Sequence, residues 1–438
     1  MHHWSKKNLL IESEEYGTLL YVGLSNSFFR LSPDAKRQTE AFISSGIMMN
    51  GDLEKIYRKT GALSEYSSEE MESLFKLKIA KREVGNTTMA LTIAPTLDCN
   101  FRCAYCYEKD NAKLGFMTND VMEALFSFIE QRKKSSLYLT WYGGEPLLAL
   151  EVIKRFNEQA HNKGINLFQT IITNGYLLNF DVIQYFHSIS LSGMQITLDG
   201  TAGTHNKRRP HMSNTDSYET ILNNLDVLYH FCIEHQWRPQ VSIRVNIDKE
   251  NKEEYVELKS LLINKYNDFF HIYFGIVTNF NSCLDQPSCA MNNKEHIDFI
   301  RILDQQYGIT ENNYFPNTLG TNYCAAQTVG SFVFDAEGYM YKCFSDVGIY
   351  KKAVGHLIDK KISNIKLETE YVIDSLAINQ KGCKECVLLY TCQGGCPNKR
   401  MSDKTDMTKL HECHILKNNI EEFLVRHYEL SQVKEVVL

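Results

Sequence analysis

The sequence lacks the features that would direct it to a membrane or to a nucleic acid. Residues 1–15 contain no continuous apolar core of the length that a secretory signal requires. No later segment approaches the roughly 18 consecutive apolar residues of a membrane span. The formal net charge of -6 gives no general attraction to phosphate groups or to anionic lipid. We therefore expect a cytoplasmic protein that has neither a membrane nor a nucleic acid as its partner.

The chain also lacks internal repeats and low-complexity linkers. Hydrophobic residues make up 43% of its 438 residues, which is enough for ordinary packed cores. What it does contain is 13 cysteines. In a reducing cytoplasm, clustered cysteines bind metal more often than they form disulfides.

Residues 1–84 are predicted to form a small module of strands and helices. Apolar runs at residues 19–24 and 28–31 flank a turn sequence and predict a hairpin. Ser32 then caps a helix that has Pro33 at its first position.

Residues 85–310 predict an α/β domain made of six βα units. The strand candidates are residues 89–96, 137–142, 167–173, 194–198, 241–247 and 272–277. Such an alternation implies a parallel sheet, either open or curled into a partial (β/α)6 barrel. Ligands then bind at the C-terminal ends of the strands. The unusual residues all follow those ends: the triplet Cys99, Cys103 and Cys106, then Gly143-Gly144-Glu145, Asn174, Asp199 and Asn246.

The triplet has the spacing Cys99-x3-Cys103-x2-Cys106. Three thiolates in one tight loop can hold three irons of a cubane 4Fe–4S cluster and leave the fourth iron open. The amine and carboxylate of S-adenosylmethionine (SAM) can fill that open position, and electron transfer from the cluster would then cleave SAM to a carbon radical. A zinc loop or free cysteines are the alternatives, but structural zinc usually takes four protein ligands.

The segment DCNFRCAYCYE at residues 98–108 resembles the cluster-binding loop of radical SAM enzymes, and the resemblance extends over residues 86–438. WYGGEP at residues 141–146 is similar to the second signature of that family. The resemblance implies that SAM is bound by residues along the predicted rim: Tyr105, Gly143, Gly144, Glu145, Asn174, Thr197, Arg209 and Asn246.

Chemistry suggests a role for some of these residues. Glu145 or neighbouring carbonyls can accept hydrogen bonds from the SAM ammonium, and Arg209 can pair with its carboxylate. Arg244 or Asn246 can contact the nucleoside or the sulfonium region. A surface or loop function is the alternative for each single residue, since Arg and Asn are common at solvated ends.

Residues 311–438 hold the remaining cysteine motifs and an amphipathic helix near residues 415–428. Their short apolar runs indicate a core organised partly by metal. The cysteines resemble the SPASM extension of radical SAM enzymes that modify peptides or proteins. That resemblance implies two auxiliary 4Fe–4S clusters, one on Cys324, Cys343 and Cys396, the other on Cys383, Cys386, Cys392 and Cys413. A zinc ribbon is the alternative for the cysteines between 383 and 396.

The first auxiliary set departs from the pattern of some relatives, which supply a fourth cysteine where this chain has Thr318. Either Cys289 or Cys283 completes the set, or one iron is open to a substrate atom. An open iron would favour a thioether product, whereas a closed one would favour electron removal from a product radical.

A second departure follows Cys343. Sulfatase-maturing relatives carry an Asp directly after the corresponding cysteine, and that Asp is their proposed base. Here Phe344 follows, and Asp346 comes later. The departure weakens a sulfatase-maturase interpretation.

The module at residues 1–84 resembles the winged-helix peptide-recognition elements of peptide-modifying members. Such a module can bind a leader peptide as an added strand at its hairpin edge. A purely structural lid is the alternative.

The sequence therefore predicts a maturase that cleaves SAM to a 5′-deoxyadenosyl radical and abstracts hydrogen from a ribosomally made precursor peptide with a leader. The product would be a thioether or carbon-carbon crosslink or another modification. The expected reductant is a flavodoxin or ferredoxin. The alternatives are a protein-modifying maturase of the sulfatase-maturase kind and a non-catalytic iron–sulfur electron carrier.

Overall fold

A computed structural model describes residues 2–84, 87–108, 115–132, 136–213, 215–277, 290–310, 324–359, 361–402, 417 and 419–430. The chain divides into two compact units. The terminal unit comprises Met1–Gly85, Thr310–Val329 and Thr369–Leu438, and the barrel unit comprises Asn86–Ile309 and Gly330–Glu368. The three functional domains, at residues 1–84, 85–310 and 311–438, remain predictions.

The barrel unit is built on a ten-stranded sheet with the order β11-β10-β9-β8-β7-β6-β12-β13-β14-β15. Strands β6 to β11 run parallel to their neighbours. They are β6 (Thr88–Ile93), β7 (Ser136–Trp141), β8 (Leu167–Thr173), β9 (Gly193–Thr197), β10 (Gln240–Ile247) and β11 (His271–Ile276). Each overlaps one of the predicted strands, so that the predicted α/β class with its parallel sheet of the partial-barrel type is confirmed.

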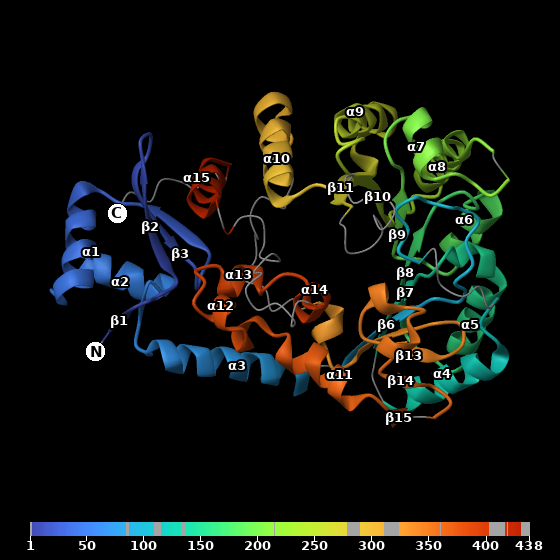
Figure 1. The fold of residues 1–438 in the computed structure, drawn as a ribbon, viewed down its shortest axis with the longest axis horizontal. Helices are drawn as coiled ribbons and strands as arrows, with labels where there is room; N and C mark the ends of the chain where they lie inside the picture. Colours follow the sequence, from blue (N-terminus) through green and yellow to red (C-terminus); the bar gives the residue numbers. More distant parts are fainter. Residues whose placement is uncertain are drawn as a thin grey trace. The chain divides into compact units, whose positions relative to one another are not determined.

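Helices cover one face of this sheet. They are α4 (Asn119–Gln131), α5 (Leu150–Asn162), α6 (Phe180–Ser188), α7 (Ala202–Arg208), α8 (Ser217–Glu234), α9 (Glu254–Tyr266) and α10 (Asn293–Tyr307). In Figure 1, α4, α5 and α6 lie along one side of strands β6 to β8.

Strand β7 shows how the sequence produces the two faces of the sheet. Leu137, Leu139 and Trp141 are buried, whereas Tyr138 between them is exposed. The alternation follows from the two-residue period of a strand. Trp141 packs edge-on against Phe156 of α5, with 5.3 Å between the ring centroids. The residues between the buried ones line the face opposite the helices.

The sheet extends beyond the predicted βα units. β12 (Ser331–Phe334) pairs in parallel with β6, and β13 (Tyr339–Tyr341), β14 (Gly355–His356) and β15 (Lys361–Ile362) continue the sheet antiparallel. Sequence reasoning missed β12 because its four residues show no alternation and its partner strand lies far away in the chain. Cys343 follows β13 and therefore belongs to the barrel unit.

The terminal unit contains a three-stranded antiparallel sheet of β2 (Asn8–Ser13), β3 (Gly17–Val22) and β4 (Ser27–Arg30). It packs against α1 (Pro33–Ser45) and α2 (Gly51–Thr60), which Figure 1 shows in blue beside it. The β3–β4 pairing confirms the predicted hairpin, and the Ser32 hydroxyl accepts a hydrogen bond from the Ala35 amide at 3.1 Å, as a helix cap does. Sequence reasoning did not place β2. The winged-helix likeness remains a prediction.

The rest of the terminal unit consists of short elements. A second small sheet pairs β1 (His3–Trp4) with β5 (Leu63–Ser64). The remaining helices of the terminal unit are α3 (Ser68–Val84), α12 (Lys381–Lys384), α13 (Leu389–Cys392), α14 (Pro397–Ser402) and α15 (Ile420–Leu430). The helix predicted near residues 415–428 is thus observed as α15; residues 415, 416 and 418 lie outside the described residues.

None of the helices that the structure describes combines the length and the apolar composition that a membrane crossing requires.

Candidate active site

Cys99, Cys103 and Cys106 lie in the loop that follows β6, at the end of the sheet where the sequence places them. Backbone hydrogen bonds hold this loop against the segment after α7. The Arg102 amide donates to the Pro210 carbonyl at 2.9 Å, and the Ala104 amide donates to the Arg208 carbonyl at 3.1 Å. The protein therefore builds the loop from its own backbone contacts.

The two glycines after β7 let their turn approach the cysteine loop closely. The Gly144 amide donates to the Thr96 carbonyl at 3.2 Å, and the Glu145 amide donates to the Asp98 carbonyl at 2.8 Å. A Cβ on Gly143 would lie 2.3 Å from the Thr96 oxygen. A Cβ on Gly144 would lie 2.3 Å from the Asp98 oxygen. Because these distances exclude any side chain, the turn requires glycine at both positions.

Glu145 joins the ends of β7 and β8. Its buried carboxylate accepts hydrogen bonds from the Thr173 hydroxyl at 2.7 Å, the Asn174 amide at 2.8 Å and the Leu147 amide at 3.0 Å. Burial raises the pKa of Glu145, and these hydrogen bonds oppose the rise. The contacts give Glu145 a positioning function in the protein itself. Its predicted contact with the SAM ammonium stays a prediction.

Asn174 links the end of β8 to the cysteine loop. Its side-chain Nδ2 donates to Asn100 Oδ1 at 2.8 Å, and its Oδ1 accepts from the Tyr176 amide at 2.9 Å. The Nδ2 of Asn100 is buried and has no hydrogen-bond partner among the described residues. Sequence reasoning missed Asn100 because an asparagine between two cysteines carries no signal of its own.

The hydroxyl of Tyr105 is the centre of a polar network. It donates to a carboxylate oxygen of Asp199, and it accepts from Arg209 Nη1 at 2.6 Å and from Asn246 Nδ2 at 3.1 Å. The other Asp199 oxygen accepts from the Asn246 amide at 3.0 Å. The structure thus brings together three of the predicted SAM contacts around Asp199, which the sequence places on the rim without a role.

Three neighbours, His205, Arg208 and Arg244, complete this network. Burial lowers the pKa of His205 well below its usual value, so that the neutral ring accepts a hydrogen bond from the Asp199 amide at 3.2 Å. Arg208 is paired with Asp248 at 2.6 Å. Arg244, the alternative to Asn246 in the sequence, donates to Asn246 Oδ1 at 2.8 Å and therefore orients that side chain. Thr197 is buried at the end of β9, on the same rim.

Burial and neighbouring charges both act on the pKa values of the cysteine thiols in this loop. Burial raises the pKa of Cys99 to about 12, and the negative charge of Glu145 adds to the rise. Burial also raises the pKa of Cys103, which the positive charge of Arg209 opposes. Bound iron deprotonates such thiols. The Nε of Arg209 is buried without a hydrogen-bond partner among the described residues, so that this guanidinium retains a free donor beside the cysteines.

Within the described part of the chain, no three His, Cys, Asp or Glu side chains surround one point where a single metal ion could be held. The cysteines of a cubane each bind a different iron, so that a cubane does not require such a point.

The auxiliary cysteines are divided between the two units. Cys343 lies in the barrel unit, whereas Cys324 and Cys396 lie in the terminal unit. Their assignment to one cluster remains a prediction. Cys413, Thr318, Cys283 and Cys289 lie outside the described residues, so that the choice between an open and a closed first auxiliary cluster also remains open.

Three members of the second auxiliary set, Cys383, Cys386 and Cys392, lie on short helical turns of the terminal unit. The Cys386 amide donates to the Cys383 carbonyl at 3.0 Å, and the Cys392 amide donates to the Leu388 carbonyl at 2.8 Å. These bonds place the cysteines of α12 and α13 on consecutive turns. The fourth predicted ligand, at position 413, is outside the described residues.

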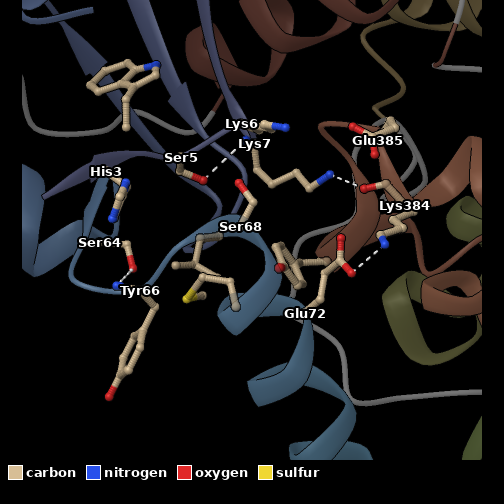
Figure 2. A pocket seen from close by; sticks show the side chains of 14 residues that line it. His3, Ser5, Lys6, Lys7, Ser64, Tyr66, Ser68, Glu72, Lys384 and Glu385 are labelled. Atoms are coloured by element: carbon tan, nitrogen blue, oxygen red, sulfur yellow. Dashed lines mark hydrogen bonds and ion pairs between the residues drawn. The ribbon is translucent and has the colours of Figure 1, made fainter.

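The N-terminal strands contact this cysteine loop at a pocket that Figure 2 shows from close by. The ammonium of Lys7 donates to the backbone carbonyl of Lys384, between two of the cysteines, and the Lys384 ammonium pairs with Glu72 of α3 at 2.7 Å. A Cβ on Gly23 would lie 2.5 Å from the Val387 carbonyl oxygen. Residues 1–84 and the cysteine loop therefore pack together as parts of one unit.

Comparison with known proteins agrees with this site. Residues 93–262 match the Radical SAM superfamily. The matched segment begins at the end of β6 and includes the cysteine triplet and the Tyr105 network. The chain contains a radical SAM domain and is a radical SAM enzyme, which implies SAM and a 4Fe–4S cluster as cofactors.

Particular relatives extend the likeness over most of the chain. The cysteine-type anaerobic sulfatase-maturating enzyme of Clostridium novyi (strain NT) is 22% identical over 346 residues, which cover 70% of this chain and 88% of that enzyme. The radical SAM cyclopropyl synthase TigE of Paramaledivibacter caminithermalis is 22% identical over 432 residues, covering 88% of this chain and 83% of the relative. The solved structure of native anSMEcpe with bound AdoMet and Cp18Cys peptide superposes with a TM-score of 0.61 at 18% identity, covering 78% of this chain and 97% of that one. The superposition supports the same fold.

Proposed function

We propose that this enzyme is a peptide maturase that acts on a ribosomally made precursor peptide. The observation that carries the proposal is the cysteine triplet at the C-terminal rim of a parallel sheet, held beside the buried Tyr105 network. A shielded electron carrier has no use for a three-cysteine loop next to unpartnered polar donors.

In this proposal, Cys99, Cys103 and Cys106 bind the 4Fe–4S cluster that binds SAM. When bound and reduced, these cofactors supply a 5′-deoxyadenosyl radical that can abstract hydrogen from an unactivated carbon. Arg209 provides a fixed positive charge and a free Nε donor for the SAM carboxylate. Tyr105 holds Arg209 and Asn246 in place through its hydroxyl, and the glycine turn keeps the loops close.

The face of the sheet opposite the helices offers a surface for the substrate. Tyr138 of β7 and Phe168 of β8 stack there with 5.0 Å between their ring centroids, and they are 49% and 41% exposed. A stacked, exposed aromatic pair within a sheet is suited to an apolar peptide side chain. The pair lies in the N-terminal halves of β7 and β8, so that it would hold a part of the peptide away from the cysteines at the C-terminal ends of the strands.

The module at residues 1–84 supplies leader recognition in the proposal. Within the described residues, β2 and β4 each pair on one side only, so that either can accept an added peptide strand. The relationship to a sulfatase-maturating enzyme and the peptide bound in the anSMEcpe structure favour a peptide or protein substrate.

The cysteines of the SPASM-like region would bind two auxiliary 4Fe–4S clusters, and a flavodoxin or ferredoxin would reduce the enzyme. The product would be a thioether or carbon-carbon crosslink or another modification of the peptide. These assignments are supported by cysteine spacing and by the two turns that present Cys383, Cys386 and Cys392.

Modification of a folded protein, as by the sulfatase-maturating relatives, is the second candidate because those enzymes match most of the chain. The residue after Cys343 is Phe344, whose ring contacts Tyr142 at 5.5 Å between centroids. Asp346 is fully buried and paired with Lys352 at 2.7 Å, which suits a structural function better than that of a base. A peptide crosslink therefore remains our first choice.

The test is co-expression of the full chain with each short peptide encoded beside its gene, followed by mass spectrometry. We expect one peptide to lose hydrogen in the presence of the enzyme and to stay unchanged when Cys99, Cys103 and Cys106 are replaced by Ala. Modification of a sulfatase fragment, with every such peptide unchanged, would instead support the second candidate.

A further inference from the structure

The guanidinium of Arg400 on α14 forms no ion pair with a carboxylate among the described residues, and its nitrogens are buried. Its Nε, Nη1 and Nη2 nitrogens are all buried, and none donates to an oxygen acceptor among the described residues. An arginine carries five N–H donors, and burying them without acceptors is costly. The surroundings of this guanidinium must therefore contain some other group that accepts its hydrogen bonds.

Three cysteine thiols lie close enough to Arg400 to act on its charge. Burial lowers the pKa of Arg400, and the negative charges of Cys383, Cys392 and Cys396 oppose this lowering. Cys383 and Cys392 belong to the four cysteines predicted for the second auxiliary cluster, and Cys396 belongs to the first set. The arginine thus lies among ligands that come from three separate turns of the chain.

Gly394 provides the space for this side chain. A Cβ on Gly394 would lie 2.1 Å from Arg400 Nη1, and the glycine has a φ of +85°. Both the missing side chain and the left-handed backbone therefore permit the guanidinium to reach the cysteines. A backbone hydrogen bond also holds Arg400 near the cysteines, because the Arg400 amide donates to the Cys396 carbonyl at 3.3 Å.

A positive charge at this place has a definite consequence for an iron–sulfur cluster. Thiolate ligands and the cluster sulfides give an oxidised 4Fe–4S cluster a net negative charge, and reduction adds one more electron. Hydrogen bonds to the sulfurs and nearby positive charge stabilise the reduced form and raise the reduction potential. Arginine serves this purpose at any pH, since it does not lose its proton.

We infer that Arg400 is a positioning residue of the second auxiliary cluster, donating its N–H groups to the cluster sulfurs and raising its reduction potential. The inference rests on the proposed function, because it requires that Cys383, Cys386 and Cys392 bind iron. It assigns to the SPASM-like region a residue outside the cysteine motifs. The cluster would accept one electron more readily than it would beside a neutral side chain, and Arg400 itself would be unchanged.

The test is a redox titration of the reconstituted full chain, followed by electron paramagnetic resonance, in wild type and in Arg400→Gln, Arg400→Lys and Lys381→Gln. Lys381 is exposed on α12, close to the same cysteines in the chain, so that its replacement removes an equal charge that solvent already screens. At the potential where one auxiliary cluster of the wild type is half reduced, we expect Arg400→Gln to lower the ratio of reduced to oxidised cluster at least about tenfold. For a one-electron couple this corresponds to a midpoint potential lower by about 59 mV. The other two variants should stay within about threefold of wild type.

A ratio in Arg400→Gln within about threefold of wild type would overturn the inference. If Arg400→Gln fails to retain the cluster, iron analysis of Arg400→Lys decides: retained iron supports the need for charge, and loss of iron in both variants overturns it. Absence of auxiliary iron in the wild-type chain would instead reject the proposed function, so that the two failures are distinguishable.

Discussion

The loop of Cys99, Cys103 and Cys106 follows a strand of a ten-stranded sheet, whereas Cys383 and Cys392 lie on helices of four residues each. The first loop is held by backbone hydrogen bonds to its neighbours and rests on a sheet whose inner residues, such as Trp141, are fully buried. The second depends on a small apolar cluster to which α3 contributes Phe75 and Ile79. Helices of one turn are not stable alone.

The difference separates two ways of building a metal site. In the barrel unit, packing and backbone hydrogen bonds hold the cysteine loop in place. In the terminal unit, residues 1–84 contribute to the apolar cluster, and under the proposed function bound metal would supply further stability. Deleting residues 1–84 would therefore remove support for the cysteine loop as well as any leader site, so that point variants test the module more cleanly.

The largest expected effect is on catalysis. Replacing Cys99, Cys103 and Cys106 together by Ala should reduce 5′-deoxyadenosine formation at least about a hundredfold, because no cluster remains to bind SAM. Iron should fall from about twelve to about eight atoms per chain, as the auxiliary clusters load independently. Chromatography of the nucleoside and iron analysis measure both. Cys232→Ala, which alters a buried cysteine of α8 outside every motif, is the matched control and should change neither.

Metal removal should distinguish the two units directly. After anaerobic chelation of iron, we expect amide hydrogen exchange to accelerate at least about tenfold in residues 376–400, where metal supplies stability, and to change little in β6 to β9. Exchange followed by mass spectrometry gives the comparison segment by segment. Equal acceleration in both regions would show that the contrast between the two sites is wrong.

The Tyr105 network should respond to loss of one hydroxyl. Tyr105→Phe leaves Asp199, Arg209 and Asn246 without their shared partner, at a cost of roughly 1–3 kcal/mol, and we expect SAM to bind at least about tenfold more weakly. Iron content should be unchanged. Tyr107→Phe is the matched control, since the buried Tyr107 hydroxyl has no hydrogen-bond partner among the described residues. Equal SAM binding by both variants, measured by equilibrium dialysis, would refute the positioning function.

The smallest effect concerns the contact between α3 and the cysteine region. Phe75 packs on Tyr390 at 4.8 Å between ring centroids, so that Phe75→Ala should lower the free energy of unfolding of the terminal unit by about 1–2 kcal/mol. Leu77 on the same helix is 49% exposed, and Leu77→Ala should have little effect. Urea unfolding followed by fluorescence measures both. A larger loss from Leu77→Ala would contradict the packing described for α3.

The sequence predicted the parallel sheet well because each strand of a βα unit has its own apolar pattern and its partners follow in order. It missed β12, whose partner β6 lies far away in the chain, and β2, an edge strand of the three-stranded sheet. Asp199 was located on the rim but given no role, and Asn100 was missed, because the functions of both arise only from contacts made in the folded protein. Arg400 had no signal at all, since a lone arginine after a cysteine motif reads as surface charge.

The most direct test of the central claim follows hydrogen from substrate to cofactor. The reconstituted full chain would be incubated with SAM, a reductant and the candidate precursor peptide made with deuterated residues, and the 5′-deoxyadenosine would be analysed by mass spectrometry. We predict deuterium in the 5′-deoxyadenosine together with loss of deuterium from the peptide. Unlabelled 5′-deoxyadenosine beside a peptide that has been modified would contradict abstraction of hydrogen from the peptide by this site.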